Sequence, residues 1–203
     1  MDAPETNPTP PFQQAGRTAK RPYPLSFYAG RFLWGAVYWG LFRWSPPRAF
    51  AWRRMLLRCF KAKLTRTSCL YRSVKIYHPW LLEIGEQTTI AKDVDFYNLG
   101  PIGVGCHTVI SQGVVLCAGT HDYTRPDLPL LRPPIRIGSG VWLAREAFIG
   151  PGVTVHDNSV VGARSVVMKD VPPGMVVAGN PARVIKPRPM NADGGDGADG
   201  PGT

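Results

Sequence analysis

Aliphatic residues return at every sixth position through much of the second half of the chain. The longest unbroken series is Ile137, Leu143, Ile149, Val155, Val161 and Val167, and the residue after each is mostly very small. A helix repeats every 3.6 residues and a strand every two, so neither produces this pattern. The pattern instead predicts a solenoid of short strands with a triangular cross-section, in which each six-residue side points one aliphatic side chain inward.

The same step continues upstream in two shorter series. Ile84, Ile90 and Phe96 form the first series, and Val104, Ile110 and Leu116 form the second. A step of eight residues joins them, and residues 118–136 interrupt the pattern before it resumes. We expect the small residue after each aliphatic residue at a corner, where the backbone turns and a larger side chain would be crowded. Three sides would make one coil of about eighteen residues.

A helix is predicted ahead of the solenoid, over residues 46–64. Pro46 and Pro47 suit its first turn, and its apolar residues recur at helical spacing: Ala49, Trp52, Leu56, Cys59 and Phe60. Its basic residues, Arg53, Arg54, Arg58 and Lys61, fall mostly on the other side. We favour a helix that packs Trp52 and Leu56 onto the solenoid and leaves a solvated basic face. The alternative is a helix that lies on an anionic membrane surface, helped by Tyr28, Trp34, Tyr38, Trp39 and Trp44.

Charge and composition restrict the partners of the chain. The formal net charge is +10, but residues 1–80 hold 14 Lys and Arg against two acidic residues, and the rest is nearly balanced. No recognisable binding motif accompanies the charge, so we expect no nucleic-acid partner. The apolar run Phe32–Phe42 is too short to cross a bilayer, and no signal peptide is visible. Four dispersed cysteines indicate reduced thiols in a cytoplasmic protein.

These patterns divide the chain into four expected segments. Residues 1–24 form a disordered Pro-rich leader, and residues 25–66 form a basic, aromatic, helical extension. The solenoid follows over 67–186, with its loop at 118–136. Residues 187–203 form a disordered tail, because they are too Gly-rich and apolar-poor to bury a core.

Three stretches carry a resemblance to a known family. They are YHPWLLEIGE (77–86), GPIGVGCHTVISQGVVLCAGTHDY (100–123) and IGSGVWLAREAFIGPGVTVHDNSVVGARSVVMKDVPPGMVVAGNPARVI (137–185). With the six-residue repeat, and above all with THDY in the loop and a terminal GNPAR, the chain resembles the hexapeptide-repeat acyltransferases. It is most similar to the sugar O-acetyltransferases of the colanic-acid type. The resemblance implies an all-β fold, a left-handed parallel β-helix. It also implies acetyl-CoA-dependent transfer of an acetyl group to a sugar hydroxyl in exopolysaccharide or lipid-linked oligosaccharide biosynthesis, with no metal required.

His121 is the histidine most suited to chemistry. It stands in the interrupting loop, and loops on a rigid scaffold often carry catalytic groups, whereas His78, His107 and His156 are expected to be structural or surface side chains. Position alone leaves a structural role for His121 equally open, and the resemblance assigns it as the catalytic residue. A neutral imidazole would act as general base, taking the proton of the attacking sugar hydroxyl and returning it to the leaving thiolate.

The resemblance also implies binding residues for both substrates. Asn98 would contact the acceptor or orient the catalytic histidine. Asp122 and Tyr123 would shape the acceptor pocket, with ordinary loop polarity as the alternative for both. Coenzyme A would be bound by Trp142, Ala144, Ala163, Lys169, Arg183 and Lys186, with a solvated surface charge as the alternative for each cation. A backbone N–H or a hydroxyl such as that of Ser111 would stabilise the oxyanion.

The shape of a solenoid bears on its partners. A single triangular prism offers no deep cleft, and the resemblance implies a homotrimer whose active sites lie between neighbouring prisms. We expect a cytoplasmic protein, and a lipid-linked acceptor would explain a basic extension that contacts the inner face of the cytoplasmic membrane, the alternative given above. Two other functions stay open. One is a non-catalytic β-solenoid that serves as a structural or binding module. The other is a metal-dependent, carbonic-anhydrase-like enzyme, although the loop supplies only His121 where such a site needs two nearby histidines.

Overall fold

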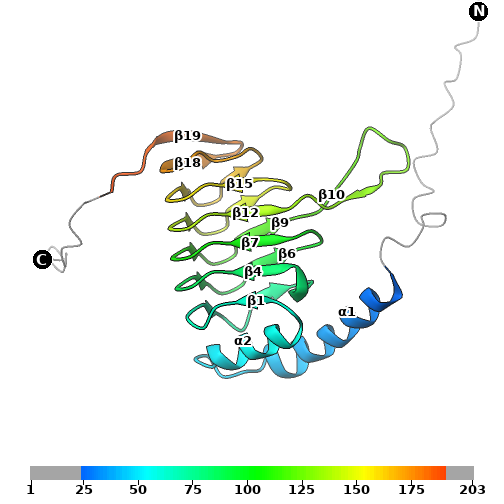
Figure 1. Cartoon of the computed structure of the whole chain (residues 1–203). Helices are drawn as coiled ribbons and strands as arrows, with labels where there is room; N and C mark the ends of the chain where they lie inside the picture. Colours follow the sequence, from blue (N-terminus) through cyan, green and yellow to red (C-terminus); the bar gives the residue numbers. More distant parts are fainter. Residues whose placement is uncertain (1–23, 191–203) are drawn as a thin grey trace, which may run out of the picture.

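Short strands stack into a three-sided solenoid with two helices at its base (Figure 1). The computed structural model describes residues 24–190, so the predicted leader and most of the predicted tail lie outside the described residues. Face 1 holds β1 (Lys63–Leu64), β4 (Leu82–Ile84), β7 (Ile102–Val104), β12 (Ile135–Ile137) and β15 (Thr154–Val155). Face 2 holds β2 (Cys69–Leu70), β5 (Thr89–Ile90), β8 (Val109–Ile110), β13 (Trp142–Leu143), β16 (Val160–Val161), β18 (Met175–Gly179) and β19 (Ala182–Pro187). Face 3 holds β3 (Lys75–Ile76), β6 (Asp95–Tyr97), β9 (Val115–Cys117), β14 (Phe148–Ile149) and β17 (Val166–Val167).

The aliphatic residues predicted to point inward form the core. They pair in register from coil to coil, for example Ile84 with Val104 and Ile110 with Leu143. None of the twelve residues in the three series is more than 5% exposed. Burying one such side chain contributes about 1.5–3 kcal/mol, so the stack supplies the main favourable term in folding. The predicted fold class, a left-handed parallel β-helix, is confirmed.

The prediction of one inward side chain per side was incomplete. The fourth residue after each aliphatic residue also points inward, as the buried Thr88, Val94, Thr108 and Val114 show. The buried hydroxyls lose no hydrogen bonds, because Thr88 donates to the carbonyl of Gly105 at 2.7 Å and Thr108 donates to that of Gly138 at 2.8 Å. Each coil therefore satisfies its inward polar atoms on the backbone of the next coil.

The corners also differ from the prediction. The backbone takes a left-handed conformation three residues after the aliphatic residue rather than one, for example at Gln87 (φ 51°) and His107 (φ 53°). The small residue directly after the aliphatic one is needed for another reason. A Cβ at Gly85 would lie 2.6 Å from the carbonyl carbon of Gly105, and a Cβ at Gly105 would lie 2.6 Å from that of Gly138. Crowding thus comes from the neighbouring coil.

Coil length varies along the solenoid. Leu64 pairs with Ile84 and Ile84 with Val104, a repeat of 20 residues, whereas Ile137 pairs with Val155 after the expected 18. The extra residues lie on the edge where the chain passes from face 3 to face 1, which we call edge 3–1. A short 3₁₀ helix, η2 (Pro79–Leu81), occupies this edge in the first coil.

A hairpin projects from edge 3–1 in the middle of the solenoid (Figure 1). It consists of β10 (Thr120–His121) and β11 (Leu130–Leu131), paired antiparallel, and it accounts for the predicted interruption at 118–136. The far end of the solenoid is a second antiparallel hairpin, β18–β19.

The helices at the base differ in extent from the predicted one. Helix α1 (Leu25–Val37) continues into the π-helical η1 (Tyr38–Phe42), and α2 covers Phe50–Cys59 rather than 46–64. The chain leaves α2 through Lys61, whose φ of 64° is not helical, and residues 63–64 already belong to β1. None of the helices within residues 24–190 has the length and apolarity needed to cross a membrane.

The arginines of α2 close the open end of the first coil, so the expected solvated basic face was wrong in part. Arg53 is fully buried and donates to the carbonyl of Leu70 at 2.6 Å. Arg54 donates to the carbonyl of Ser68 at 2.7 Å, and Arg58 donates to that of Leu64 at 2.8 Å. No further coil lies below these three carbonyls, so they have no backbone N–H group to accept a hydrogen bond from. Trp52, expected to pack inward, is 40% exposed, while Leu56 is buried as predicted.

Trp34 of α1 completes this cap on the third face. Its indole Nε1 donates to the carbonyl of Ile76 at 2.7 Å. All three faces of the first coil therefore end on side-chain donors from the helices. Unpaired edges of a sheet invite pairing with other chains, and this cap protects them.

Candidate functional site

His121 lies on β10, near the root of the projecting hairpin, and its side chain is exposed. Its ring Nδ1 is 2.6 Å from the carbonyl oxygen of Leu128. A carbonyl oxygen can only accept a hydrogen bond, so Nδ1 carries the proton in the neutral ring. The other nitrogen, Nε2, is then left with a free lone pair and can take a proton from a substrate.

The position of Leu128 supports this arrangement. Its backbone φ of 43° lies in the left-handed region, which leucine seldom adopts. The hairpin pairs His121 with Leu130, and the backbone N–H of Asp122 donates to the carbonyl of Pro129 at 3.0 Å. The segment opposite His121 is thereby held in place by the backbone. This contact could not be predicted from the sequence, because it depends on a main-chain atom and not on a residue type.

Asp122 and Tyr123 follow His121 in the hairpin. The carboxylate of Asp122 accepts hydrogen bonds from the hydroxyl and the backbone N–H of Thr124, and these bonds lower the pKa of Asp122 below its usual value. Tyr123 is 86% exposed. Both residues therefore lie at the surface on the same strand end as His121, where an acceptor could reach them.

Asn98 has a different environment from the one predicted. Its side chain is fully buried, and its Oδ1 accepts from the backbone N–H groups of Tyr77 and His78, both at 3.0 Å. Its Nδ2 donates to the carbonyl of His78 at 2.6 Å. The amide fixes the turn before η2 on edge 3–1. Because a side chain so enclosed offers no surface to an acceptor in the single chain, we do not include Asn98 in the proposed site.

Three predicted donor-binding residues lie close together, away from the hairpin. Trp142 is on face 2 and is 47% exposed, and its indole Nε1 donates to Ser111 Oγ at 3.0 Å. Ala144 and Ala163 follow adjacent strands, since Leu143 pairs with Val161, and they line the edge between faces 2 and 3, which we call edge 2–3. Of these residues Trp142 and Ala163 are exposed and Ala144 is buried, and we call the surface that they form the strip.

An ion network that the sequence analysis missed lies beside this strip. Glu146 accepts from Arg145 Nε at 2.9 Å and from Arg164 Nε at 2.7 Å. The two arginines lower the pKa of Glu146. Arg145 and Glu146 are adjacent in sequence, but Arg164 is one coil further on, and only the coil register brings it to Glu146. The pairing could have been found by aligning the sequence on the 18-residue repeat.

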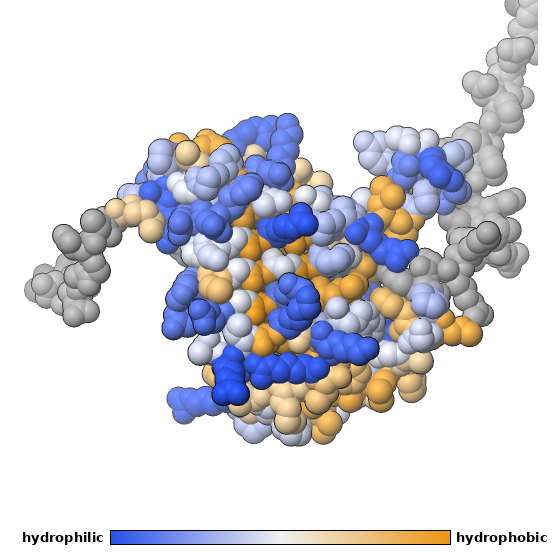
Figure 2. Space-filling view, in the orientation of Figure 1, coloured by the Kyte–Doolittle hydropathy of each residue, from blue (hydrophilic) through white to orange (hydrophobic). Residues whose placement is uncertain are grey.

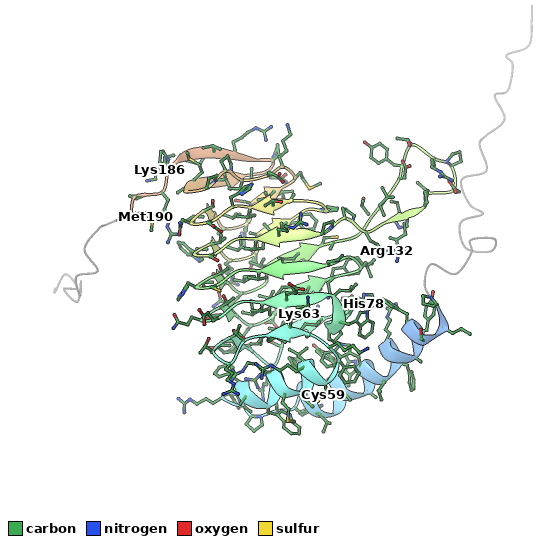
Figure 3. All side chains as sticks on the ribbon, viewed as in Figure 1. Cys59, Lys63, His78, Arg132, Lys186 and Met190 are labelled. Atoms are coloured by element: carbon green, nitrogen blue, oxygen red, sulfur yellow. The ribbon has the colours of Figure 1, made fainter. Side chains whose placement is uncertain are left out.

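The predicted phosphate-binding cations are dispersed. Arg183 and Lys186 lie on β19, at the far end of face 2. Lys169 is exposed and follows β17, so it lies on edge 3–1, the edge that carries the hairpin. In Figure 3 Lys186 is at the end of the solenoid, on the opposite side from Arg132 at the foot of the hairpin.

Within one chain, the candidate proton acceptor and the candidate donor-binding residues therefore lie on different edges of the solenoid. The imidazole projects from edge 3–1, and the strip with Trp142 lies on face 2 and edge 2–3. Within residues 24–190, no three His, Cys, Asp or Glu side chains gather in a way that could hold a metal ion. The arrangement suits proton transfer by His121 to or from a molecule that a second surface holds.

Comparison with known proteins gives several relatives and no matching family model. The chain is 46% identical over 156 residues to colanic acid biosynthesis acetyltransferase WcaF of Escherichia coli K12. The aligned residues cover 77% of this chain and 86% of the relative. The structure is similar to that of a maltose O-acetyltransferase from Clostridium difficile 630, with TM-score 0.73 and 27% identity over 82% of this chain and 90% of that one. It is also similar to the hexapeptide-repeat acetyltransferase VCA0836 of Vibrio cholerae in complex with acetyl-CoA. There the TM-score is 0.73 and the identity 28%, over 85% of this chain and 94% of the other.

Proposed function

The chain belongs to the hexapeptide-repeat acetyltransferases, and from this premise we propose that it transfers an acetyl group from acetyl-CoA to a sugar hydroxyl. The family confirms the resemblance inferred from the sequence. The relatives named for colanic acid biosynthesis and for maltose support a sugar acceptor, in exopolysaccharide or lipid-linked oligosaccharide assembly. The observation that carries the proposal is the contact between His121 Nδ1 and the Leu128 carbonyl, which leaves Nε2 free for a substrate proton.

The proposed reaction is a direct transfer with His121 as general base. The sugar oxygen attacks the thioester carbonyl carbon while Nε2 of His121 takes the hydroxyl proton. The tetrahedral intermediate collapses, the C–S bond breaks, and the proton passes from Nε2 to the thiolate of coenzyme A. A base in this position contributes on the order of 10²–10⁴ in rate. Ser111 accepts a hydrogen bond from Trp142, so its own hydroxyl proton is available for the oxyanion.

Acetyl-CoA would lie along the strip on face 2 and edge 2–3. Trp142 would contact the thiol arm, and the small side chains of Ala144 and Ala163 leave the backbone of two successive corners open to the amides of the arm. Arg183 and Lys186 at the end of face 2 would meet the phosphates, with Lys169 approaching from another edge. The acetyl-CoA complex of a relative with the same fold supports this use of the solenoid.

The site would be completed between chains. Because the imidazole and the donor strip lie on different edges of one prism, a neighbouring prism would bring its strip to the hairpin of the first. We therefore propose a homotrimer with three shared sites, in which Asp122 and Tyr123 line the acceptor pocket. Light scattering on active preparations would give three times the chain mass, and a monomer with full activity would contradict this assembly.

We also place the enzyme at the inner face of the cytoplasmic membrane. The support is the helical extension at the base, which is basic and carries large exposed apolar side chains such as Phe32 (83% exposed) and Trp44 (78% exposed). A lipid-linked acceptor would be presented at this surface.

The decisive experiment is a thiol-release assay with acetyl-CoA and a panel of glycans and nucleotide sugars. We expect thiol release that depends on the acceptor, and its loss in His121→Ala. A silent His121→Ala would favour a non-catalytic solenoid. One zinc ion per chain, with hydration of carbon dioxide, would favour the carbonic-anhydrase-like alternative.

A further inference from the structure

A pocket lies between α1 and the lowest strand of face 3, away from the acetyl-transfer site. Its volume is about 360 Å³. We call it the base pocket, and its wall combines three cations with four aromatic side chains: Arg31, Arg43, Lys75, Trp34, Tyr38, Trp39 and Tyr77. The pocket serves no step of the reaction proposed above.

The charges in the base pocket select an anion. Asp93 is the acidic residue in the lining, against three cations. Lys75 lies 3.8 Å from Asp95, but within residues 24–190 neither Arg31 nor Arg43 takes part in an ion pair. Two guanidinium groups with unpaired forks suit phosphate oxygens, which they can bind through two parallel hydrogen bonds.

The surface around the pocket is apolar. Trp39 lines the pocket and is 65% exposed, and Phe32 and Leu33 on α1 are exposed by 83% and 57%. Among residues 24–190, seventeen large apolar side chains are exposed, and nine of them lie within residues 25–55. Figure 2 shows apolar side chains gathered at the lower end of the molecule, where Figure 1 places α1 and α2. An occupant of this surface has to offer both a phosphate and hydrocarbon.

A second copy of the chain does not meet this requirement. The sequence has no acidic residue between Glu5 and Glu83, so two such surfaces face to face would bring like charges together. An anionic bilayer supplies phosphates for the arginines and a hydrocarbon boundary for the exposed rings, and tryptophan and tyrosine are favoured at that depth. Charge complementarity therefore favours lipid.

We propose that the base pocket binds the phosphate group of a membrane lipid while the exposed Phe32, Leu33, Trp39 and Trp44 enter the acyl boundary. The inference rests on the membrane contact proposed above and assigns it to particular residues. It also orients the enzyme. Tyr77 at the pocket contacts Tyr97 of the next coil, with ring centroids 4.8 Å apart, and Tyr97 pairs with Cys117, which leads into the hairpin. His121 would stand two coils, or about 10 Å, above the lipid phosphates.

The test is co-sedimentation of the full chain with vesicles in the absence of acetyl-CoA. The vesicles are phosphatidylcholine alone and phosphatidylcholine with phosphatidic acid, whose phosphate is exposed. We expect binding to the second only. The double variant Arg31→Gln/Arg43→Gln should weaken it about 25-fold, about five-fold for each cation at an anionic surface. The matched control, Arg136→Gln/Arg164→Gln, removes the same charge from exposed sites on the upper coils and should change binding less than about two-fold.

Further arms separate the remaining outcomes. Phe32→Ser/Trp44→Ser changes only exposed side chains and should abolish vesicle binding without loss of fold. Vesicle binding that is absent in the intact chain, or equally weakened in both double variants, would overturn the proposal. So would tight binding of inorganic phosphate without vesicles, or a change in oligomer mass caused by Phe32→Ser/Trp44→Ser. Because no acetyl donor is present, failure here leaves the thiol-release result on His121 untouched.

Discussion

The base of the molecule and the projecting hairpin are both irregular additions to one regular solenoid, and they treat their polar groups in opposite ways. At the base, Arg53 is fully buried, and the three nitrogen atoms of its guanidinium group donate to three backbone carbonyls and to Ser45 Oγ. In the hairpin, His121 and the Arg125–Asp127 pair are exposed, and their hydrogen bonds join residues of the hairpin itself. The base uses charge to complete the fold, whereas the hairpin keeps its polar groups available.

This difference shows that charge density along a sequence is a poor guide to function. The most basic third of the chain contains cations that are partly architectural, and the nearly neutral remainder contains the imidazole suited to catalysis. Whether a cation or an imidazole is free to act depends on which carbonyls need a donor. Each of the following variants tests one side of the comparison.

The largest effect is expected in the hairpin. In His121→Asn the side-chain amide can still donate to the Leu128 carbonyl, so the hairpin keeps its shape but loses its base. We expect kcat to fall by about 10²–10⁴ with an unchanged unfolding midpoint. Steady-state thiol release and thermal unfolding measure the two quantities. A large fall in stability would mean that the imidazole has a structural role like that of Arg53.

At the base the expected effect is on stability. Arg53→Met keeps most of the volume but leaves the carbonyls of Leu70, Pro46 and Pro47 without their donor. We expect a loss of about 3 kcal/mol in the free energy of unfolding, because buried acceptors without partners are costly. Urea denaturation measures it. Arg48→Met, an exposed change in the same segment, should stay within about 0.5 kcal/mol, and equal effects of the two would contradict the cap.

A smaller effect concerns pH and His78, which lies beside α1. Burial lowers the pKa of His78 below its ordinary 6.5, and the nearby Arg31 adds to the shift. The unfolded chain then takes up a proton at a higher pH than the folded chain, so stability is full above pH 6.5 and falls as the pH drops toward the folded pKa. Urea midpoints between neutral and mildly acid pH should show this slope, and His78→Gln should reduce it. An unchanged slope in His78→Gln would contradict this role of His78.

The smallest effect is expected for an exposed ion pair on the lowest coils. Lys63 and Glu83 face each other on β1 and β4, and both side chains are more than half exposed. Lys63→Met should change the free energy of unfolding by less than about 1 kcal/mol. A loss as large as that of Arg53→Met would show that position at the base, rather than burial, decides what a cation contributes.

Much of the solenoid could be predicted because it repeats. The six-residue spacing of inward aliphatic residues, such as Ile137 and Leu143, recurs many times. A segment that breaks this spacing, such as the loop at 118–136, is therefore easy to recognise. The helices could not be placed as well. Arg53 was assigned to a solvated face from the sequence because its side chain is charged. Its burial is explained by the carbonyl of Leu70, which has no neighbouring coil to donate to it and accepts from Arg53 instead. The His121 contact with Leu128 and the burial of Asn98 depend on backbone geometry, which residue types do not record.

A stack of parallel coils has no natural length, since each finished coil offers an edge on which another could be laid. Here one end is occupied by α2, and at the other β19 reverses the chain direction and presents Arg183 and Lys186 along the outermost strand. The helices thus cover one end of the prism, and at the other end β19 covers the outer edge of face 2. The homotrimer proposed above would form sideways, flank against flank, which is the direction that gives a closed ring with a fixed number of copies.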